Sequence, residues 1–299
     1  MRLLALLLLH ARVRGFECPA ESTGGHAIPP SVFYTGKWDV NLKGLTMLTG
    51  KWPENYVFHY YDDERMAASM VGLDAALQSV GVAGGLEAFE ALRPGAYKAD
   101  LWRYCVIWAC GGMYLDSKMT LALPFGKFLN RTHLEMPRAA GAPAVPKLIT
   151  CIDRWVSKLD RYNNMETLVK NVTGIWQGML VATPHHPDLL KVIRAVVKNV
   201  RARSYPSVEG KLEMLYITGP GTFARATQWD DRRWTERIHL PCHWGNHGPE
   251  LRTIWGSGSL LFFQNATLHD SLRGGAHVSY GEMYKRHEVY IDDPVLEQP

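Results

Sequence analysis

The stretch GAYKADLWRYCVIWACGGMYLDSKM, residues 95–119, decides the fold, because a helix pattern and a strand pattern meet in it at two glycines. Apolar residues recur at i, i+3, i+4 and i+7 within 98–110, which predicts a helix with one buried stripe. Gly111 can end this helix in a left-handed conformation. Alternation over 113–116 predicts a short strand that ends on Asp116. Open α/β sheets bind ligands at the carboxyl ends of their strands, so Asp116 is the first candidate site residue.

Strand and helix patterns alternate along the rest of the chain. Runs of β-branched and aromatic residues predict strands, and amphipathic or glycine-broken stretches predict helices between them. This alternation predicts an α/β fold with a mixed, mostly parallel sheet flanked by helices. Residues 125–147, rich in proline and alanine, are expected to be irregular. The predicted strands are 31–35, 56–61, 176–183 and 259–264, and the predicted helices are 63–92 in pieces, 189–202, and one that begins after the turn at 218–223.

Residues 1–27 are interpreted as a signal-like or leader-like segment, and residues 28–299 as one domain. The 299 residues, 46% of them hydrophobic, suffice for one large core. The apolar run Leu3–Leu9 is too short to span a bilayer and sits at the lower limit for a signal-peptide core. Membrane association is therefore expected only through this segment. Three N-glycosylation sequons favour the secretory pathway (ER or Golgi lumen, or secretion), although sequons also arise by chance. They begin at Asn130, Asn171 and Asn265.

Charge and cysteine usage exclude some classes of function. The formal charge of +4 comes from interspersed basic and acidic residues without a basic block, so nucleic acid is not an expected partner. Five cysteines at irregular spacing give no disulfide framework, and Cys105 and Cys110 are interpreted as packing residues. Cys242, His243 and His247 lie in a loop without a second ligand pair, which disfavours a zinc site.

Asp100 and Arg103 are the other charged residues of interest in the opening stretch. They are three residues apart, so they are neighbours on the predicted helix. The plain interpretation is an ordinary ion pair, worth a few tenths of a kcal/mol. Asp116 is equally compatible with a simple turn residue. Periodicity alone leaves both the structural and the functional interpretation open.

The same residues resemble the core signature of glycosyltransferase family 32, a family of DXD-type sugar transferases. Its pattern is roughly aDlxRYxxLxxxGGxYxDxD, and this chain supplies Ala99–Tyr104 and Gly111–Asp116. The resemblance therefore rests on a specific core with looser flanks. The flanking similarity covers residues 28–34, 52–64, 219–220 and 280–290.

This resemblance implies a GT-A fold, a Rossmann-like sandwich that binds a sugar nucleotide, and sugar transfer that usually retains anomeric configuration. It implies that Asp100 contacts ribose or sugar hydroxyls and that Arg103 lies near the sugar or diphosphate. Tyr114 would lie against the nucleotide, and Asp116 would bind a divalent ion directly or through water. The implied donor-binding residues are Tyr34, Asp100, Arg103, Gly112 and Tyr114.

The implied cofactor is Mn²⁺ or Mg²⁺, because a hard cation on carboxylate oxygens can stabilise the charge that grows on a departing diphosphate. Lys118 stands where the motif has its second acid. An ammonium about 4 Å from a phosphate oxygen gains roughly 4 kcal/mol at an effective dielectric near 20. Lys118 can thus weaken the metal requirement, or it can fold back on Asp116 and quench it. By analogy with the C-terminal histidine of transferases of this fold, His277 is a second candidate metal ligand, the alternative being an exposed loop histidine.

These patterns predict a glycosyltransferase that moves a sugar from a UDP- or GDP-sugar to a glycan, lipid or protein acceptor. Asp116 and Lys118 are its expected catalytic residues. The alternative is a catalytically inactive homologue that binds a sugar nucleotide or glycan on the same fold. A glycoside hydrolase needs an acid and a nucleophile across a cleft, and the sequence indicates no such pair.

Overall fold

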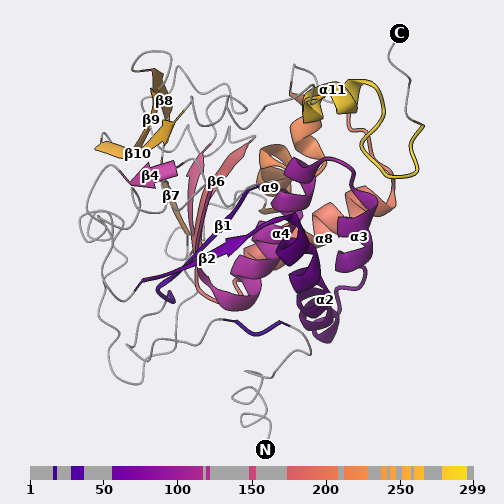
Figure 1. The fold of residues 1–299 in the computed structure, drawn as a ribbon, viewed down its shortest axis with the longest axis horizontal. Helices are drawn as coiled ribbons and strands as arrows, with labels where there is room; N and C mark the ends of the chain where they lie inside the picture. The colour runs from indigo at the N-terminus through magenta and orange to yellow at the C-terminus, as the bar shows by residue number, and fades with distance from the viewer. Residues whose placement is uncertain are drawn as a thin grey trace, which may run out of the picture.

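The protein folds into two β-sheets, with helices beside the larger sheet (Figure 1). The computed structural model describes residues 16–18, 28–36, 56–116, 119–121, 148–152, 174–207, 212–227, 237–240, 243–246, 251–256, 259–265 and 278–294. The strands are β1 (Ser31–Thr35), β2 (Val57–Tyr61), β3 (Gly112–Leu115), β4 (Met119–Leu121), β5 (Leu148–Ile152), β6 (Ile175–Ala182), β7 (Arg237–Leu240), β8 (His243–Asn246), β9 (Leu251–Gly256) and β10 (Ser259–Asn265). The helices are α2 (Asp63–Ser79), α3 (Gly85–Ala91), α4 (Gly95–Cys110), α8 (Pro187–Arg201), α9 (Pro220–Thr227), α11 (Tyr280–Lys285) and the 3₁₀ turn η1 (Glu213–Tyr216).

The larger sheet has the strand order β2-β1-β3-β6-β5-β7. Five of its strands run in one direction, and β6 runs in the opposite one between β3 and β5. This arrangement confirms the predicted α/β fold with a mixed, mostly parallel sheet, and it fits the GT-A fold that the resemblance implied. Because β1, β2 and β3 are parallel neighbours, their carboxyl ends lie side by side along the same end of the sheet. Asp116 directly follows β3 at this end.

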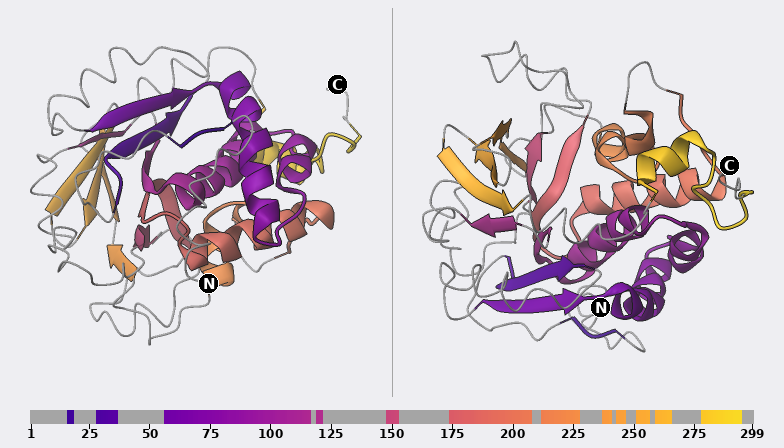
Figure 2. Two further views of the ribbon diagram at one scale, coloured as in Figure 1. Left: turned by 90° about the horizontal axis from the view of Figure 1, so that it is seen from below. Right: turned by 45° about the horizontal axis from the view of Figure 1, so that its top comes forward.

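Helix α4 lies at the centre of the helical layer, which covers one side of the larger sheet (Figure 2). It packs against α2 and α8 and against strands β3 and β6. The sequence predicted one buried stripe, but side chains on nearly every side of α4 are buried, because protein covers it all round. Trp102 illustrates this burial. Its ring contacts Tyr61 and Tyr114, and its indole N–H donates to Ser69 Oγ at 2.8 Å.

The smaller sheet, β4-β10-β9-β8, is antiparallel and lies away from the helices (Figures 1 and 2). Only β10 of this sheet was predicted, because the sequence around β8 and β9 is punctuated by Gly, Pro and His and shows no clear alternation. Strands β5 and β7 and helix α11 were also missed. The segment 125–147 lies outside the described residues. Over the described part of the chain, no helix is long and apolar enough to cross a membrane.

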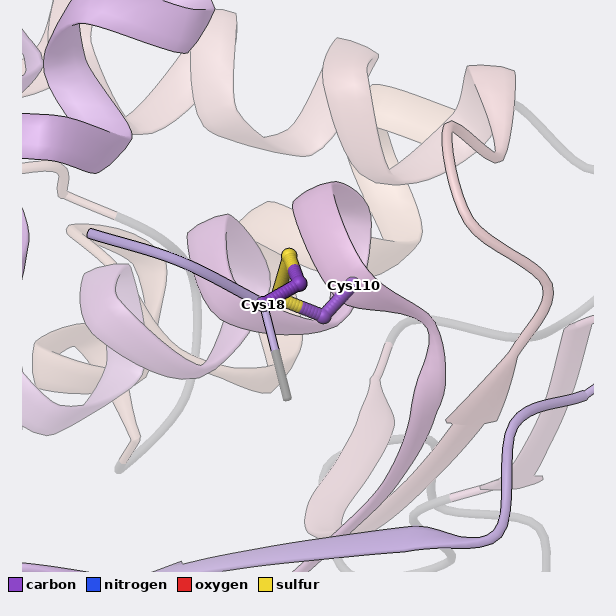
Figure 3. Close-up of a disulfide and its surroundings, with 2 residues drawn as sticks. All are labelled: Cys18 and Cys110. Carbon is purple, nitrogen blue, oxygen red and sulfur yellow. A yellow bond between two sulfur atoms is a disulfide. The ribbon is translucent and has the colours of Figure 1, made fainter. Parts of the chain in front are cut away.

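A disulfide fastens the N-terminal segment to the last turn of α4. Cys18 is bonded to Cys110 across 92 residues of sequence, with the two Cα atoms 5.3 Å apart (Figure 3). Two residues earlier, Phe16 is buried against α2. A Cβ atom on Gly72 would lie 2.4 Å from Phe16 Cβ, so a glycine is needed at that point of the helix.

The interpretation of Cys110 as a packing residue is therefore wrong. Its partner is too distant in sequence for spacing alone to reveal the pair. Cys105 is a buried free thiol, as predicted, and Cys151 is also disulfide-bonded.

We predict that the double change Cys18→Ala and Cys110→Ala lowers the free energy of unfolding by about 4 kcal/mol, since the disulfide closes a loop of 92 residues. Urea unfolding under non-reducing conditions measures the loss. Cys105→Ala is the matched control, because it removes a buried thiol without opening a covalent loop. An equal loss in the control and the double variant would show that packing, rather than the cross-link, stabilises the protein.

Candidate functional site

Two carboxylates flank one buried guanidinium at the carboxyl end of β3. Arg103 Nη2 lies 3.3 Å from Asp100 Oδ1, and Arg103 Nη1 lies 3.7 Å from Asp116 Oδ1. The side chains of Arg103 and Asp100 are only 9% and 13% exposed, whereas that of Asp116 is 25% exposed. The expected helical neighbours thus form a buried pair. The plain interpretation as an i,i+3 ion pair is right about the pairing, but the few tenths of a kcal/mol typical of exposed pairs do not apply, because removing one partner of a buried pair leaves an uncompensated charge.

The two glycines after α4 position the strand that carries Asp116. Gly111 and Gly112 adopt φ values of +68° and +88°, in the region that favours glycine. A Cβ atom on Gly112 would lie 2.5 Å from the carbonyl oxygen of Ser31, so β3 passes close to β1 at this point. The structure therefore gives Gly112 a backbone role. Its implied contact with the donor stays a prediction.

Tyr114 contacts both Arg103 and Asp116. Its hydroxyl donates to Asp116 Oδ1 at 3.0 Å, and the Arg103 guanidinium lies 4.5 Å from the centre of its ring. The side chain is 1% exposed, so its ring is covered by protein. The contact of this ring with a nucleotide, which the resemblance implied, would need that cover to move. In the structure Tyr114 holds Arg103 and Asp116 in place.

Tyr34 is not brought to this cluster. Its neighbour Phe33 pairs in register with Tyr114 and shares its face of the sheet. By alternation Tyr34 points to the opposite face, where its ring lies 5.3 Å from Tyr60 on β2. A donor-binding role for Tyr34 stays a prediction.

Sequence reasoning missed three residues that hold the charged cluster. Thr218 donates its hydroxyl to Asp100 Oδ2 at 2.7 Å, and Tyr104 donates its hydroxyl to the Thr218 carbonyl at 3.0 Å. Arg103 donates from Nη1 to the Gln177 carbonyl at 2.9 Å. Two signals were present in the sequence. Thr218 precedes the Gly219-Pro220 turn, and Gln177 is a polar residue within an apolar strand.

Burial and neighbouring charges set the pKa values of Asp100 and Arg103 in opposite ways. Burial raises the pKa of Asp100 to about 6, although the Arg103 charge and the Thr218 hydrogen bond oppose the rise. Burial alone would lower the pKa of Arg103, but Tyr114, Asp100 and Asp116 outweigh it and raise that pKa. At neutral pH the cluster therefore contains one guanidinium cation and an ionised Asp100.

The carboxylates of the described residues can bind a divalent cation if a substrate supplies further ligands. Mg²⁺-type sites in enzymes often use one or two carboxylates together with substrate phosphates and water. Asp116 offers one partly exposed carboxylate, and the described residues contain no group of three potential ligand side chains. The cluster thus fits an ion shared with a bound diphosphate, rather than an ion caged by protein alone. Lys118 and His277 lie outside the described residues, so their expected roles stay predictions.

The fold is that of an α/β protein, and at the carboxyl end of one of its parallel strands a partly exposed carboxylate lies beside a buried cation. Residues 74–135 match the family described as "Glycosyltransferase sugar-binding region containing DXD motif". The match includes α4, β3 and the charged cluster. It supports the coarser prediction, a glycosyltransferase with a DXD-type sugar-binding region. The assignment to family 32 stays a prediction.

Other known proteins add little. Among solved structures, the chain is similar to "PaToxG Glycosyltransferase", with 14% sequence identity over 70% of each chain and a TM-score of 0.40. A TM-score this low supports no conclusion about fold or function. No curated protein sequence matches the chain significantly.

We predict that Asp100 makes the folded state less stable as the pH rises from about 4 to above 6. The pKa of Asp100 is raised from 3.8 to about 6, so in this interval the folded state holds a proton that the unfolded state has lost. Protonated Asp100 contributes its full stabilisation to the folded state below pH 3.8. This stabilisation is lost as the pH rises through 6, and the free energy of unfolding changes by up to about 3 kcal/mol.

Urea unfolding of the wild-type protein and of Asp100→Asn, measured from pH 4 to pH 8, tests this prediction. The stability of the wild type is expected to fall relative to that of the variant as the pH rises. Parallel stability curves would contradict the assigned titration.

Proposed function

We propose that this protein transfers a sugar from a nucleoside-diphosphate sugar, either UDP- or GDP-linked, to a glycan, lipid or protein acceptor. The observation that carries the proposal is the Asp100–Arg103–Asp116 cluster at the end of β3, a buried ion pair beside a partly exposed carboxylate, inside the matched sugar-binding region. Such a cluster presents charge and hydrogen-bonding groups to a ligand at the edge where open α/β sheets bind theirs.

Each residue of the cluster has a distinct part in the proposal. A carboxylate has about four acceptor positions, so Asp100 can accept a ribose or sugar hydroxyl beyond its bonds to Thr218 and Arg103. Arg103 lies between Asp100 and Asp116 and offsets their negative charges. Asp116 would hold Mn²⁺ or Mg²⁺, which supplies positive charge to the leaving diphosphate. Lys118 would add a second positive charge beside the same oxygens.

Finer parts of the proposal rest on other features. Membership of glycosyltransferase family 32 and transfer with retention follow from the sequence resemblance. A place in the secretory pathway is supported by the Cys18–Cys110 disulfide, because disulfides persist mainly in oxidising compartments. The three sequons in the sequence are compatible with that location.

A donor screen tests the function directly. Purified protein is incubated with a panel of UDP- and GDP-sugars, with and without Mn²⁺, and both hydrolysis and transfer are recorded. We expect turnover of at least one donor and a fall of at least about 10²-fold in Asp116→Asn, which loses charge stabilisation at the diphosphate. Asp292→Asn is the matched control, since Asp292 pairs with Arg203 at the surface.

Two outcomes would contradict the proposal. Full activity of Asp116→Asn would remove that carboxylate from the reaction. Donor binding without hydrolysis or transfer, across the whole panel, would support the inactive binding homologue instead.

We further predict that Lys118→Ala raises the Mn²⁺ concentration needed for half-maximal activity, because the metal must then supply the charge that the ammonium supplied. The measurement is a Mn²⁺ titration of donor turnover for the wild type and the variant. If a chelator and Lys118→Ala both leave turnover unchanged, neither cation takes part.

A further inference from the structure

Hydrogen bonds and one ion pair, that of Asp100 with Arg103, form a closed ring of side chains and carbonyls. The side-chain amide of Gln177 donates to the Tyr104 hydroxyl, which donates to the Thr218 carbonyl. The Thr218 hydroxyl donates to Asp100, and Asp100 pairs with Arg103. Arg103 closes the ring by donating to the Gln177 carbonyl. The ring thus joins three parts of the chain: α4, β6 and the turn before α9.

The ring is buried, so each of its bonds has a large effect. Thr218 and Tyr104 are 0% exposed, and Gln177 is 3% exposed. A buried polar group that loses its partner keeps its full desolvation penalty, because water cannot replace the lost bond. Such a ring favours one arrangement of its side chains over all others.

The ring fixes the carboxylate of Asp100 at both oxygens. Arg103 approaches Oδ1 from the same helix, and Thr218 approaches Oδ2 from the turn that precedes α9. Thr218 is itself held on its backbone side, where its carbonyl accepts from Tyr104. The orientation of Asp100 therefore depends on a hydroxyl that is 118 residues away in the sequence.

We propose that Thr218 is a positioning residue of the transfer reaction, which holds the Asp100 carboxylate in one orientation toward the donor. The inference rests on the proposed function, because it names the group that prepares one residue of that site. Thr218 acts through Asp100 and does not itself contact the reacting atoms.

The charges around Asp100 give this role a measurable signature. Within the described part of the chain, Asp100 interacts with Arg103, Tyr97 and Tyr104 on α4 and with Tyr114 and Asp116 from β3. Of the groups that act on its pKa, Arg103 and Thr218 lower it, whereas burial and Asp116 raise it. Loss of the Thr218 hydroxyl therefore raises the pKa of Asp100 further. A residue that only fills space would not change the titration.

The test compares Thr218→Val, which lacks the hydroxyl, with Thr218→Ser, which keeps it. Thr227→Val is the matched control, because the Thr227 hydroxyl is also buried but donates only to helix carbonyls of Phe223 and Ala224. The first measurement is the melting temperature of each variant between pH 5 and pH 8. We expect the melting temperature of Thr218→Val to fall further below that of the wild type as the pH rises, and the deficit of Thr227→Val to stay constant.

The second measurement is the pH profile of kcat/KM for the best donor. In Thr218→Val we expect kcat/KM to fall roughly tenfold near neutral pH, the usual effect of losing a hydrogen bond to a charged group. The acidic limb of the profile should move to higher pH. Thr218→Ser should restore both the level and the limb. If Thr218→Val is too unstable to purify, Thr218→Ala is expected to show the same pH signature.

The two measurements separate this inference from the proposed function. Unfolding needs no substrate, so a pH-dependent deficit without any donor turnover would keep the Thr218–Asp100 link and reject the sugar transfer. A pH-independent deficit in Thr218→Val, with an unmoved acidic limb, would overturn the positioning role even in an active enzyme. Failure of Thr218→Ser to restore activity would overturn it as well.

Discussion

The buried guanidinium of Arg103 is the constraint on which the rest of the site depends. A charge removed from water needs opposite charge and hydrogen-bond acceptors close by, or the folded state is strongly destabilised. In this protein the compensation comes from Asp100 on the same helix, from Asp116 at the end of β3 and from a carbonyl of β6. Each lies on a different backbone segment. The need to neutralise one cation therefore fixes how α4, β3 and β6 lie relative to one another.

Local chemistry in the sequence was sufficient for the helix–strand unit at the centre of the fold. The helix, the two glycines after it and the short strand were predicted from consecutive residues, and the structure has all three, although α4 is buried on nearly every side and β3 at all four positions. The neighbouring positions of Asp100 and Arg103 follow in the same way from their spacing on a helix. The sequence therefore predicted that Asp116 ends a strand close to this helix, whereas a ligand site there stays a prediction.

Distant contacts could not be predicted, and they determine how the site behaves. Spacing along a helix says nothing about burial, so it could not distinguish a surface ion pair from the buried Asp100–Arg103 pair. The partner of Asp100 in the turn before α9 and the partner of Cys110 in the N-terminal segment are 118 and 92 residues away. Only the packed chain brings such residues together. The same applies to the raised pKa of Asp100, whose first cause is burial.

The charge of Arg103 also helps to explain why position 118 can be a lysine where the DXD motif has its second acid. With an Asp at that position, the cluster would carry three carboxylates against one guanidinium. With Lys118 the formal charges of Asp100, Arg103, Asp116 and Lys118 cancel. Under the proposed function, a bound diphosphate would then bring the largest uncompensated charge, and the lysine would oppose it. In that proposal a metal ion would add to an existing attraction instead of first having to overcome a surplus of negative charge, so the substitution would change the share of the metal without removing the chemical basis of transfer.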